Sequence, residues 1–173
     1  MKPFHTHGHI EVITGPMFAG KTEELIRRVR REAFAQKNII VFKPSIDQRY
    51  AFDEVVSHNN NRIQSIAIAN SLEMESHVDD SIEVIAIDEI QFLDEGVIPL
   101  IQRYANQGIR VIVCGLDQDF RGEPFTFMPK LLSLAEEVQK LTAICVKCHA
   151  PATRTQRLVN GKPAFYEDPL ILI

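Results

Sequence analysis

Residues 15–22 read Gly-Pro-Met-Phe-Ala-Gly-Lys-Thr, which fits the pattern G-x-x-x-x-G-K-[ST]. An alternating apolar run at 10–14 precedes them, and a segment with helical periodicity follows at 22–36. A strand, a glycine-containing loop and a helix in this order indicate a phosphate loop, whose backbone N–H groups surround a triphosphate. Lys21 is expected to reach the β- and γ-phosphates, and Thr22 is expected to offer its hydroxyl to Mg²⁺. The sequence therefore predicts a site for a nucleoside triphosphate.

The composition limits the classes of protein to which the chain can belong. Its 173 residues can bury one substantial core and leave room for a small appendage. No apolar run approaches the roughly 20 residues that a membrane span requires. A net charge of −4 argues against a protein that coats nucleic acid, and the N-terminus lacks the apolar core of an export signal. We therefore expect a cytoplasmic protein with neither nucleic acid nor a membrane as its partner.

The rest of the chain alternates between short apolar runs and segments of helical periodicity. Strands are predicted at 38–43, 62–68, 82–87, 109–114 and 138–144, and helices at 71–77, 94–107 and 129–137. The polar segments 44–62 and 117–128 are predicted to be long loops, which in compact domains tend to be functional. Strands that alternate with helices predict an α/β fold of the P-loop NTPase kind, with a parallel sheet flanked by helices on both faces.

The character of the sequence changes after residue 144. Cys145-Val146-Lys147-Cys148 opens a segment that has no helical periodicity. Short strands are predicted at 153–158 and 162–166, and Asn160-Gly161 between them suits a type I′ hairpin turn. We therefore predict a nucleotide-binding domain at 1–144 and a small second domain at 145–173.

Two adjacent acids follow the apolar strand at 82–87. Asp88 stands where a Walker B carboxylate holds the metal beside the phosphate loop, because ligands gather at the carboxyl ends of parallel strands. Glu89 adds a second carboxylate, which is able to accept a proton from an attacking hydroxyl or water. This pair alone does not separate a kinase from an ATPase.

Arginines near the predicted site have competing interpretations. Arg49 lies in the polar loop 44–62, where a guanidinium can neutralise charge on a transferring phosphoryl group, but a solvated loop arginine fits equally well. On the first helix, Glu23 and Glu24 precede Arg27 and Arg28 by four residues. That spacing favours ion pairs on a solvated helix face over a phosphate site.

The cysteines and N-terminal histidines suggest one metal site. Cys145 and Cys148 form half of a tetrahedral zinc site, which needs four ligands, and a redox C-x-x-C is a weaker interpretation because it should open a helix. Cys114 lies within an apolar strand and is expected to be a buried structural thiol. The histidines of the N-terminal segment alternate, but a frayed terminus is the preferred interpretation for them; they are His5, His7 and His9.

Taken together, the motifs resemble those of type II thymidine kinases, the zinc-bearing tetrameric class. The resemblance covers nearly the whole chain in order, and the combination is far more specific than a phosphate loop alone. Its matching segments are 15–22, Phe42-Lys-Pro44, Asp47–Tyr50, Asp88-Glu-Ile-Gln-Phe92, Gly115-Leu-Asp-Gln-Asp-Phe-Arg-Gly-Glu-Pro-Phe125, Leu134-Ala-Glu136, Lys140-Leu-Thr-Ala143 and Cys145–Leu158.

The resemblance implies transfer of the ATP γ-phosphate to the 5′-hydroxyl of thymidine, and also of deoxyuridine, in pyrimidine deoxynucleotide salvage. It also implies a homotetramer, feedback inhibition by thymidine triphosphate, and Mg²⁺ and Zn²⁺ as cofactors. Glu89 would be the general base, and Arg49 would stabilise transition-state charge. The resemblance assigns ATP and its phosphates to Gly15, Pro16, Met17, Phe18, Ala19, Gly20, Lys21, Thr22, Asp88 and Gln91, with Mg²⁺ at Thr22 and Asp88.

The nucleoside pocket implied by the resemblance is apolar. Much of the base is expected to be held by backbone groups of a lasso-shaped loop after the Cys pair, with Thr155 near the 5-methyl group. The side chains that would enclose sugar and base are Met17, Phe92, Leu116, Phe120, Phe125 and Thr155.

The chain departs from the family pattern at its C-terminal end. Family members continue past the position of Ile173 with a Tyr that borders the base and a second Cys/His pair that completes the zinc site. Cys145 and Cys148 are the zinc ligands present in this sequence. The resemblance thus implies that the lasso domain at 145–173 is incomplete here and that the complete protein binds one Zn²⁺ per subunit.

Two other functional classes remain to be compared with a nucleoside kinase. A recombinase-type ATPase would use Glu89 to polarise water, but it would need a surface for nucleic-acid strands that the acidic composition does not favour. A zinc-ribbon interaction module with a regulatory nucleotide site is less favoured, because the set of catalytic residues is largely complete. Phosphate transfer to thymidine, compared with ATP hydrolysis without nucleoside, separates the three classes.

Overall fold

The computed structural model of the chain describes residues 8–45, 54–56 and 62–168. Its centre is a six-stranded sheet in the order β5-β2-β6-β7-β1-β8, with every neighbouring pair parallel. The strands are β1 (His9–Thr14), β2 (Ile39–Pro44), β5 (Ile66–Ile68), β6 (Val84–Ile87), β7 (Arg110–Gly115) and β8 (Glu137–Lys140). This topology confirms the predicted α/β fold.

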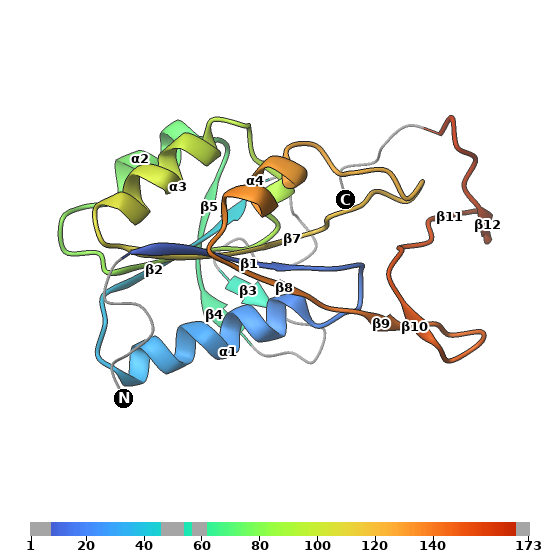
Figure 1. Cartoon of the computed structure of the whole chain (residues 1–173), viewed down its shortest axis with the longest axis horizontal. Helices are drawn as coiled ribbons and strands as arrows, with labels where there is room; N and C mark the ends of the chain where they lie inside the picture. The colour runs from blue at the N-terminus through green and yellow to red at the C-terminus, as the bar shows by residue number, and fades with distance from the viewer. Residues whose placement is uncertain (1–7, 46–53, 57–61, 169–173) are drawn as a thin grey trace.

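Helices cover both faces of the sheet (Figure 1). The helix α1 (Lys21–Phe34) covers one face, and the other face carries α2 (Ser71–His77), α3 (Val97–Asn106) and α4 (Met128–Leu134). A short 3-10 helix, η1 (Ile90–Phe92), follows β6. Within the described residues, no helix is long and apolar enough to cross a membrane.

Alternate residues of each central strand supply two separate apolar cores, as buried parallel strands require. Ile13 of β1 belongs to the core beneath α1, together with Leu25 and Ala86. The preceding residue, Val12, belongs to the core on the opposite face, together with Ile85 and Val111. Most of these side chains are fully buried. The sheet is thus a rigid platform whose carboxyl ends can hold a site.

Several predicted boundaries were wrong in detail. The predicted strand 62–68 is two strands, because β4 (Arg62–Gln64) pairs with β3 (Glu54–Val56) while β5 joins the main sheet. The short strand β3 also interrupts the predicted loop 44–62. The predicted strand 138–144 is likewise divided between β8 and β9 (Ala143–Ile144), because β9 leaves the sheet to pair with β10 (Pro151–Ala152).

The segment after residue 144 extends away from the sheet (Figure 1). It contains β10, which pairs with β9, and then a second small hairpin of β11 (Leu158–Val159) and β12 (Lys162–Pro163). The hairpin turns at Asn160 and Gly161, with φ angles of 51° and 74°. These positive values fit the predicted type I′ turn, although both strands are shorter than predicted.

A charged cluster lies between α1 and the amino-terminal halves of the central strands. Glu11 is buried in β1 and contacts Arg28 of α1, Arg110 of β7 and His9, with Arg110 Nε 2.6 Å and His9 Nε2 2.7 Å from Glu11 Oε1. Glu24 contacts Arg28 from one helical turn away. We call these five residues the amino-end cluster.

The amino-end cluster corrects two expectations from sequence. Arg28 does pair with Glu24, but it is buried and also reaches Glu11, so it does not lie on a solvated face. His9 is not frayed, because it is the first residue of β1 and is buried beside Glu11. Burial alone would raise the pKa of Glu11, but hydrogen bonds and charges from Arg110, Arg28 and His9 outweigh it and lower the pKa to about 2.

Candidate active site

The phosphate loop connects the carboxyl end of β1 with the first turn of α1. Gly20 has a φ of 86°, a left-handed conformation that glycine adopts without strain as the chain enters the helix. The Lys21 ammonium group is buried and donates to the carbonyl oxygen of Pro16 at 2.7 Å. Lys21 therefore folds back over the loop that a phosphate would occupy, beside the N-terminus of a 14-residue helix.

Asp88 and Thr22 lie side by side, although 66 residues separate them in the sequence. The Thr22 hydroxyl lies 3.3 Å from Asp88 Oδ1 and 3.2 Å from Asp88 Oδ2. A hydroxyl and a carboxylate are hard oxygen donors that suit Mg²⁺, which usually binds through one or two carboxylates together with substrate phosphates. The donor set at this position thus fits the predicted metal.

Glu89 is held in an unusual backbone conformation next to Asp88. Its φ of 49° is left-handed, and its N–H donates to Asp88 Oδ1 at 3.0 Å. Its side chain is buried and accepts a hydrogen bond from Gln91 Nε2 at 2.6 Å. A non-glycine residue in this conformation is strained, and the surrounding contacts must outweigh the cost. Strain of this kind is frequent at functional sites. The two acids predicted from sequence are thus fixed relative to each other.

Gln91 connects Glu89 with the end of β7. Its Oε1 accepts from the Leu116 N–H at 3.2 Å, and a Cβ on Gly115 would approach that oxygen to 2.4 Å. Gly115 is therefore required for this close approach. The contacts of Gln91 reach the predicted base and the predicted nucleoside pocket, and its assignment to ATP remains a prediction.

The residues predicted to enclose the nucleoside meet at the same edge of the sheet. Leu116 and Phe125 are buried in the larger apolar core, and Met17 and Phe92 pack against it. The Phe92 and Phe125 rings meet edge to face with centroids 6.0 Å apart. Four apolar side chains from four segments thus lie beside the acids and the phosphate loop.

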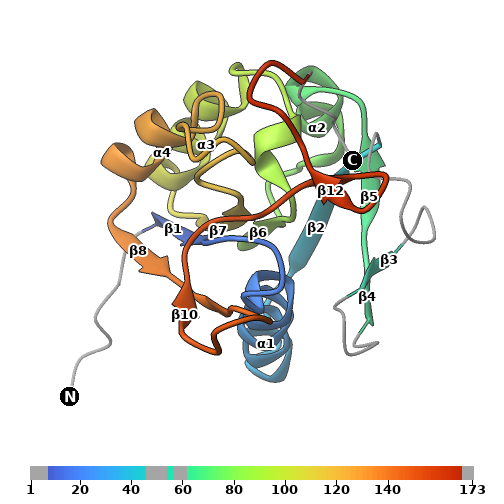
Figure 2. The same ribbon diagram turned by 90° about the vertical axis from the view of Figure 1, so that its right-hand side faces the viewer.

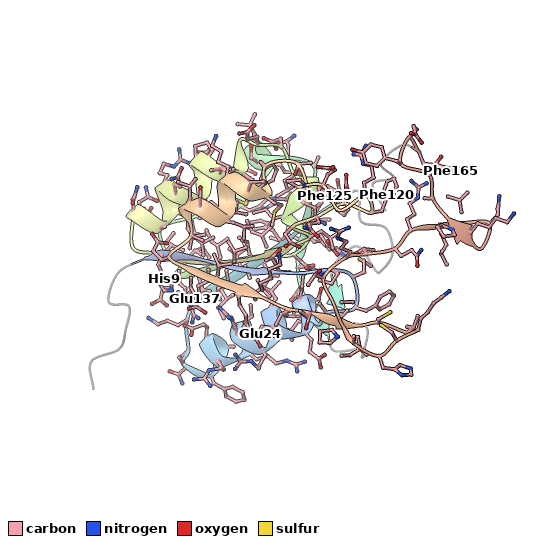
Figure 3. The ribbon with its side chains drawn as sticks, turned by 45° about the vertical axis from the view of Figure 1, so that its right-hand side comes forward. His9, Glu24, Phe120, Phe125, Glu137 and Phe165 are labelled. Carbon is pink, nitrogen blue, oxygen red and sulfur yellow. The ribbon has the colours of Figure 1, made fainter. Side chains whose placement is uncertain are left out.

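Phe120 lies farther out, where two arginines contact its ring. The Arg121 and Arg157 guanidinium carbons lie 5.7 and 5.3 Å from the ring centroid, within the range of cation–π contacts. Asp119 fixes Arg121 with contacts of 2.9 and 2.7 Å. Figure 3 shows Phe120 and Phe125 on the side of the molecule that faces the C-terminal segment.

The C-terminal segment reaches back to the phosphate loop. Thr155 Oγ1 accepts a hydrogen bond from the Met17 N–H at 2.9 Å. Arg157, two residues later, contacts Phe120, and the Tyr166 hydroxyl lies 3.3 Å from Glu123 Oε1. Figure 2 shows this segment crossing the carboxyl-end side of the sheet. The structure therefore brings predicted Thr155 to the site, whereas predicted Arg49 lies outside the described residues.

Two features of the strands on either side of β6 were not predicted from the sequence. Cys114 is buried as expected, but its Sγ also lies 2.7 Å from Asp88 Oδ1. Burial, with the Asp88 carboxylate next, raises the pKa of the Cys114 thiol well above its usual value, so the thiol stays protonated. Lys43 is buried at the carboxyl end of β2. The sequence feature that could have indicated this burial is the position of a lysine at the end of an otherwise apolar run.

Cys145 and Cys148, the predicted zinc ligands, lie at the start of the C-terminal segment. Backbone N–H groups of Cys148 and Lys147 lower the pKa of the Cys145 thiol, which favours the thiolate that zinc binds. In the part of the chain that the structure describes, no group of three or more His, Cys, Asp or Glu side chains is placed to hold a metal ion. The structural zinc site therefore stays a prediction, in which Cys145 and Cys148 would be two of the four ligands.

A comparison with protein-family models agrees with this geometry. The model described as thymidine kinase matches residues 8–173. The match includes the phosphate loop, both acids, the apolar pocket residues and the segment that contains Thr155. Because it spans nearly the whole chain, the protein belongs to the thymidine kinase family and is an ATP-dependent nucleoside kinase with ATP and thymidine as its substrates.

Proposed function

We propose that the protein transfers the γ-phosphate of ATP to the 5′-hydroxyl of thymidine and of deoxyuridine. The observation that carries this proposal is the buried pair Asp88 and Glu89, which lies beside the phosphate loop and is connected through Gln91 to the apolar residue Leu116. One acid can thus serve the donor and the other the acceptor.

Glu89 acts as the general base in this proposal. The 5′-oxygen attacks the γ-phosphorus, the bond from that phosphorus to the β–γ bridging oxygen breaks, and the hydroxyl proton passes to the Glu89 carboxylate. The products are the nucleoside 5′-monophosphate and ADP. Gln91 orients Glu89 through its 2.6 Å hydrogen bond.

The donor side consists of Lys21, Thr22 and Asp88. Lys21 leaves Pro16 O and contacts the β- and γ-phosphates, while Thr22 and Asp88 hold Mg²⁺. When bound, Mg²⁺ neutralises charge on the phosphate oxygens. Arg49 stabilises the charge that develops on the transferred group, as an arginine supplied in cis.

Deoxyuridine is included because it lacks only the 5-methyl group of thymidine. One methyl group in an apolar pocket is worth about 1–3 kcal/mol, so discrimination stays within roughly 10–200-fold. Thr155 is the proposed neighbour of that methyl group, and its hydrogen bond from Met17 holds it at the site.

Further properties follow from the resemblance stated above. We propose one structural Zn²⁺ that includes Cys145 and Cys148, a homotetramer, inhibition by thymidine triphosphate, and a salvage role in the cytoplasm. The zinc proposal is supported by the lowered pKa of Cys145. Metal analysis of the protein purified without chelators should find one Zn²⁺ per subunit, and finding none would contradict it.

One assay tests the proposed reaction against ATP hydrolysis. Labelled γ-phosphate is followed in the presence of thymidine, of deoxyuridine, or of neither nucleoside. We expect label in both nucleoside monophosphates and little free phosphate without nucleoside. Hydrolysis that ignores thymidine and rises with DNA would instead support a recombinase-type ATPase.

A further inference from the structure

Cys114 and Asp88 occupy neighbouring positions on adjacent parallel strands. The register pairs Ile87 of β6 with Val113 of β7, so the next residues along the two strands, Asp88 and Cys114, are side by side. Cys114 packs in the core beneath α1, the helix that carries Thr22. The thiol and the hydroxyl thus approach the same carboxylate from the same face of the sheet.

The two oxygens of Asp88 are held differently. Oδ1 lies 2.7 Å from Cys114 Sγ and accepts the Glu89 N–H at 3.0 Å. Thr22 Oγ1, on the side of the phosphate loop, lies 3.2 Å from Oδ2 and 3.3 Å from Oδ1, so the thiol and the Glu89 N–H are the contacts that distinguish the two oxygens. Because the terminal torsion of an Asp side chain is broad, the carboxyl plane is set by such contacts rather than by its own rotamer preference.

We propose that Cys114 is a positioning residue that fixes the carboxyl plane of Asp88 for Mg²⁺·ATP. Its thiol donates to Oδ1 and keeps that oxygen on the Glu89 N–H, so Oδ2, which receives neither of these two hydrogen bonds, is left for the metal. The same oxygen thereby connects the metal-holding acid with the strained backbone of Glu89, whose φ is 49°. This inference rests on the proposed roles of Asp88 and Glu89.

A purely structural role for Cys114 makes a different prediction. A buried cysteine often behaves as a small apolar side chain, so valine or alanine would then change stability alone. A positioning role requires a donor. Serine keeps a donor at this position, whereas valine fills the space without one.

The test compares Cys114→Val, Cys114→Ala and Cys114→Ser in binding and in turnover. Calorimetry measures the affinity for ATP at several Mg²⁺ concentrations, and steady-state assays with thymidine measure the half-saturating Mg²⁺ concentration. Since a thiol is a weak donor but its acceptor is charged, we expect the valine and alanine variants to need about three- to tenfold more Mg²⁺ in both measurements. Serine should stay within about twofold of the parent protein.

Val113→Ala is the matched control, because Val113 is buried in the same strand but belongs to the core on the opposite face. It should lower the melting temperature without changing the Mg²⁺ dependence. The inference is overturned if Cys114→Val binds Mg²⁺·ATP as the parent protein does, or if serine and valine are equally impaired. If alanine prevents folding, the comparison of valine with serine still decides. Absence of thymidine phosphorylation by the parent protein would instead contradict the proposed function.

Discussion

The buried charged side chains at the two ends of the central sheet contact different kinds of groups. At the amino end, Glu11 is surrounded by full charges, with Arg28 and Arg110 both in contact with it. At the carboxyl end, the contacts of Asp88 include a hydroxyl, a thiol and a backbone N–H, and Lys21 rests on a carbonyl oxygen. Figure 3 shows how far His9, Glu24 and Glu137 lie from Phe120 and Phe125.

Because of this difference, the charges at the amino end stabilise the fold, whereas those at the carboxyl end can interact with a bound ligand. A buried carboxylate between two guanidinium groups contributes to stability, because removing either guanidinium group would leave buried charge without its partner and destabilise the fold. The hydroxyl, the thiol and the backbone N–H do not neutralise the Asp88 carboxylate, and the Pro16 carbonyl oxygen does not neutralise the Lys21 ammonium group, so both charges can act on a ligand. Mutations at the amino end should therefore change stability, and mutations at the carboxyl end should change turnover.

The largest effect is expected from Glu89→Gln at the carboxyl end. The amide cannot accept the proton of the 5′-hydroxyl, so kcat should fall by about 10²–10⁴-fold while ATP binding and the melting temperature change little. Steady-state kinetics and calorimetry measure these quantities. Glu95→Gln is the matched control, since Glu95 is exposed and pairs with Lys130. Near-normal turnover of Glu89→Gln would remove Glu89 from its role.

The second effect, at the amino end, is a loss of stability with little change in activity. Glu11→Gln keeps the shape of the side chain but removes the charge that pairs with Arg28 and Arg110, so the free energy of unfolding should fall by about 3 kcal/mol. Denaturant titration measures the loss, and kcat/KM well below the melting temperature should stay close to that of the parent protein.

Glu83→Gln removes a carboxylate from an exposed pair with Lys37 and serves as the control for Glu11→Gln. It should change stability little, because exposed ion pairs contribute little. A Glu11→Gln protein as stable as this control would show that the amino-end cluster does not stabilise the fold.

The third effect is a pH dependence of stability that belongs to the amino end. The pKa of Glu11 is lowered from 4.5 to about 2, so its contribution is complete above about pH 4.5 and disappears as the pH falls toward 2. The free energy of unfolding should therefore decrease through this window, and more steeply in the parent protein than in Glu11→Gln. Equal slopes in urea titrations of both proteins would contradict the assignment. Glu24, whose pKa is also lowered to about 2, mainly by its hydrogen bond from Arg27, supplies part of the remaining slope, and other carboxyl groups with lowered pKa values, such as Asp94 and Asp119, contribute as well.

The smallest effect concerns the outer part of the nucleoside pocket. Arg157→Leu removes a cation from the Phe120 ring, and a cation–π contact between two half-buried side chains that water still reaches contributes about 1 kcal/mol. We expect KM for thymidine to rise about two- to fivefold with kcat nearly unchanged. Lys162→Leu, in the nearby hairpin, is the control. A large fall in kcat would instead place Arg157 in the chemistry.

The main features of the fold were predictable because they depend on local patterns. Periodicity placed α1, α2 and the central strands, and alternation of strands with helices gave the parallel sheet. The predicted strand 62–68 failed because nothing local indicates that Ser65, between β4 and β5, divides one run between two sheets. Burial of Arg28 was missed for a related reason: its partner Glu11 is 17 residues away, on another element.

The site was predictable where a motif carries the chemistry. The proximity of Asp88 to the loop at 15–22 was expected from the sequence, and the roles of these residues stay predictions. The contact between Cys114 and Asp88 does not, because it depends on the register of β6 against β7. The position of Thr155 beside Met17 also depends on how the chain returns over 138 residues, and it was expected only from the family resemblance.

The strand order has a consequence for synthesis on the ribosome. The first strand made, β1, pairs with β7 and β8, whose residues emerge about a hundred positions later. During elongation at about 5–20 residues per second, β1 therefore waits several seconds with unpaired backbone groups. An exposed strand edge of this kind invites pairing with other chains, so the nascent protein needs protection until the last sheet strand is complete.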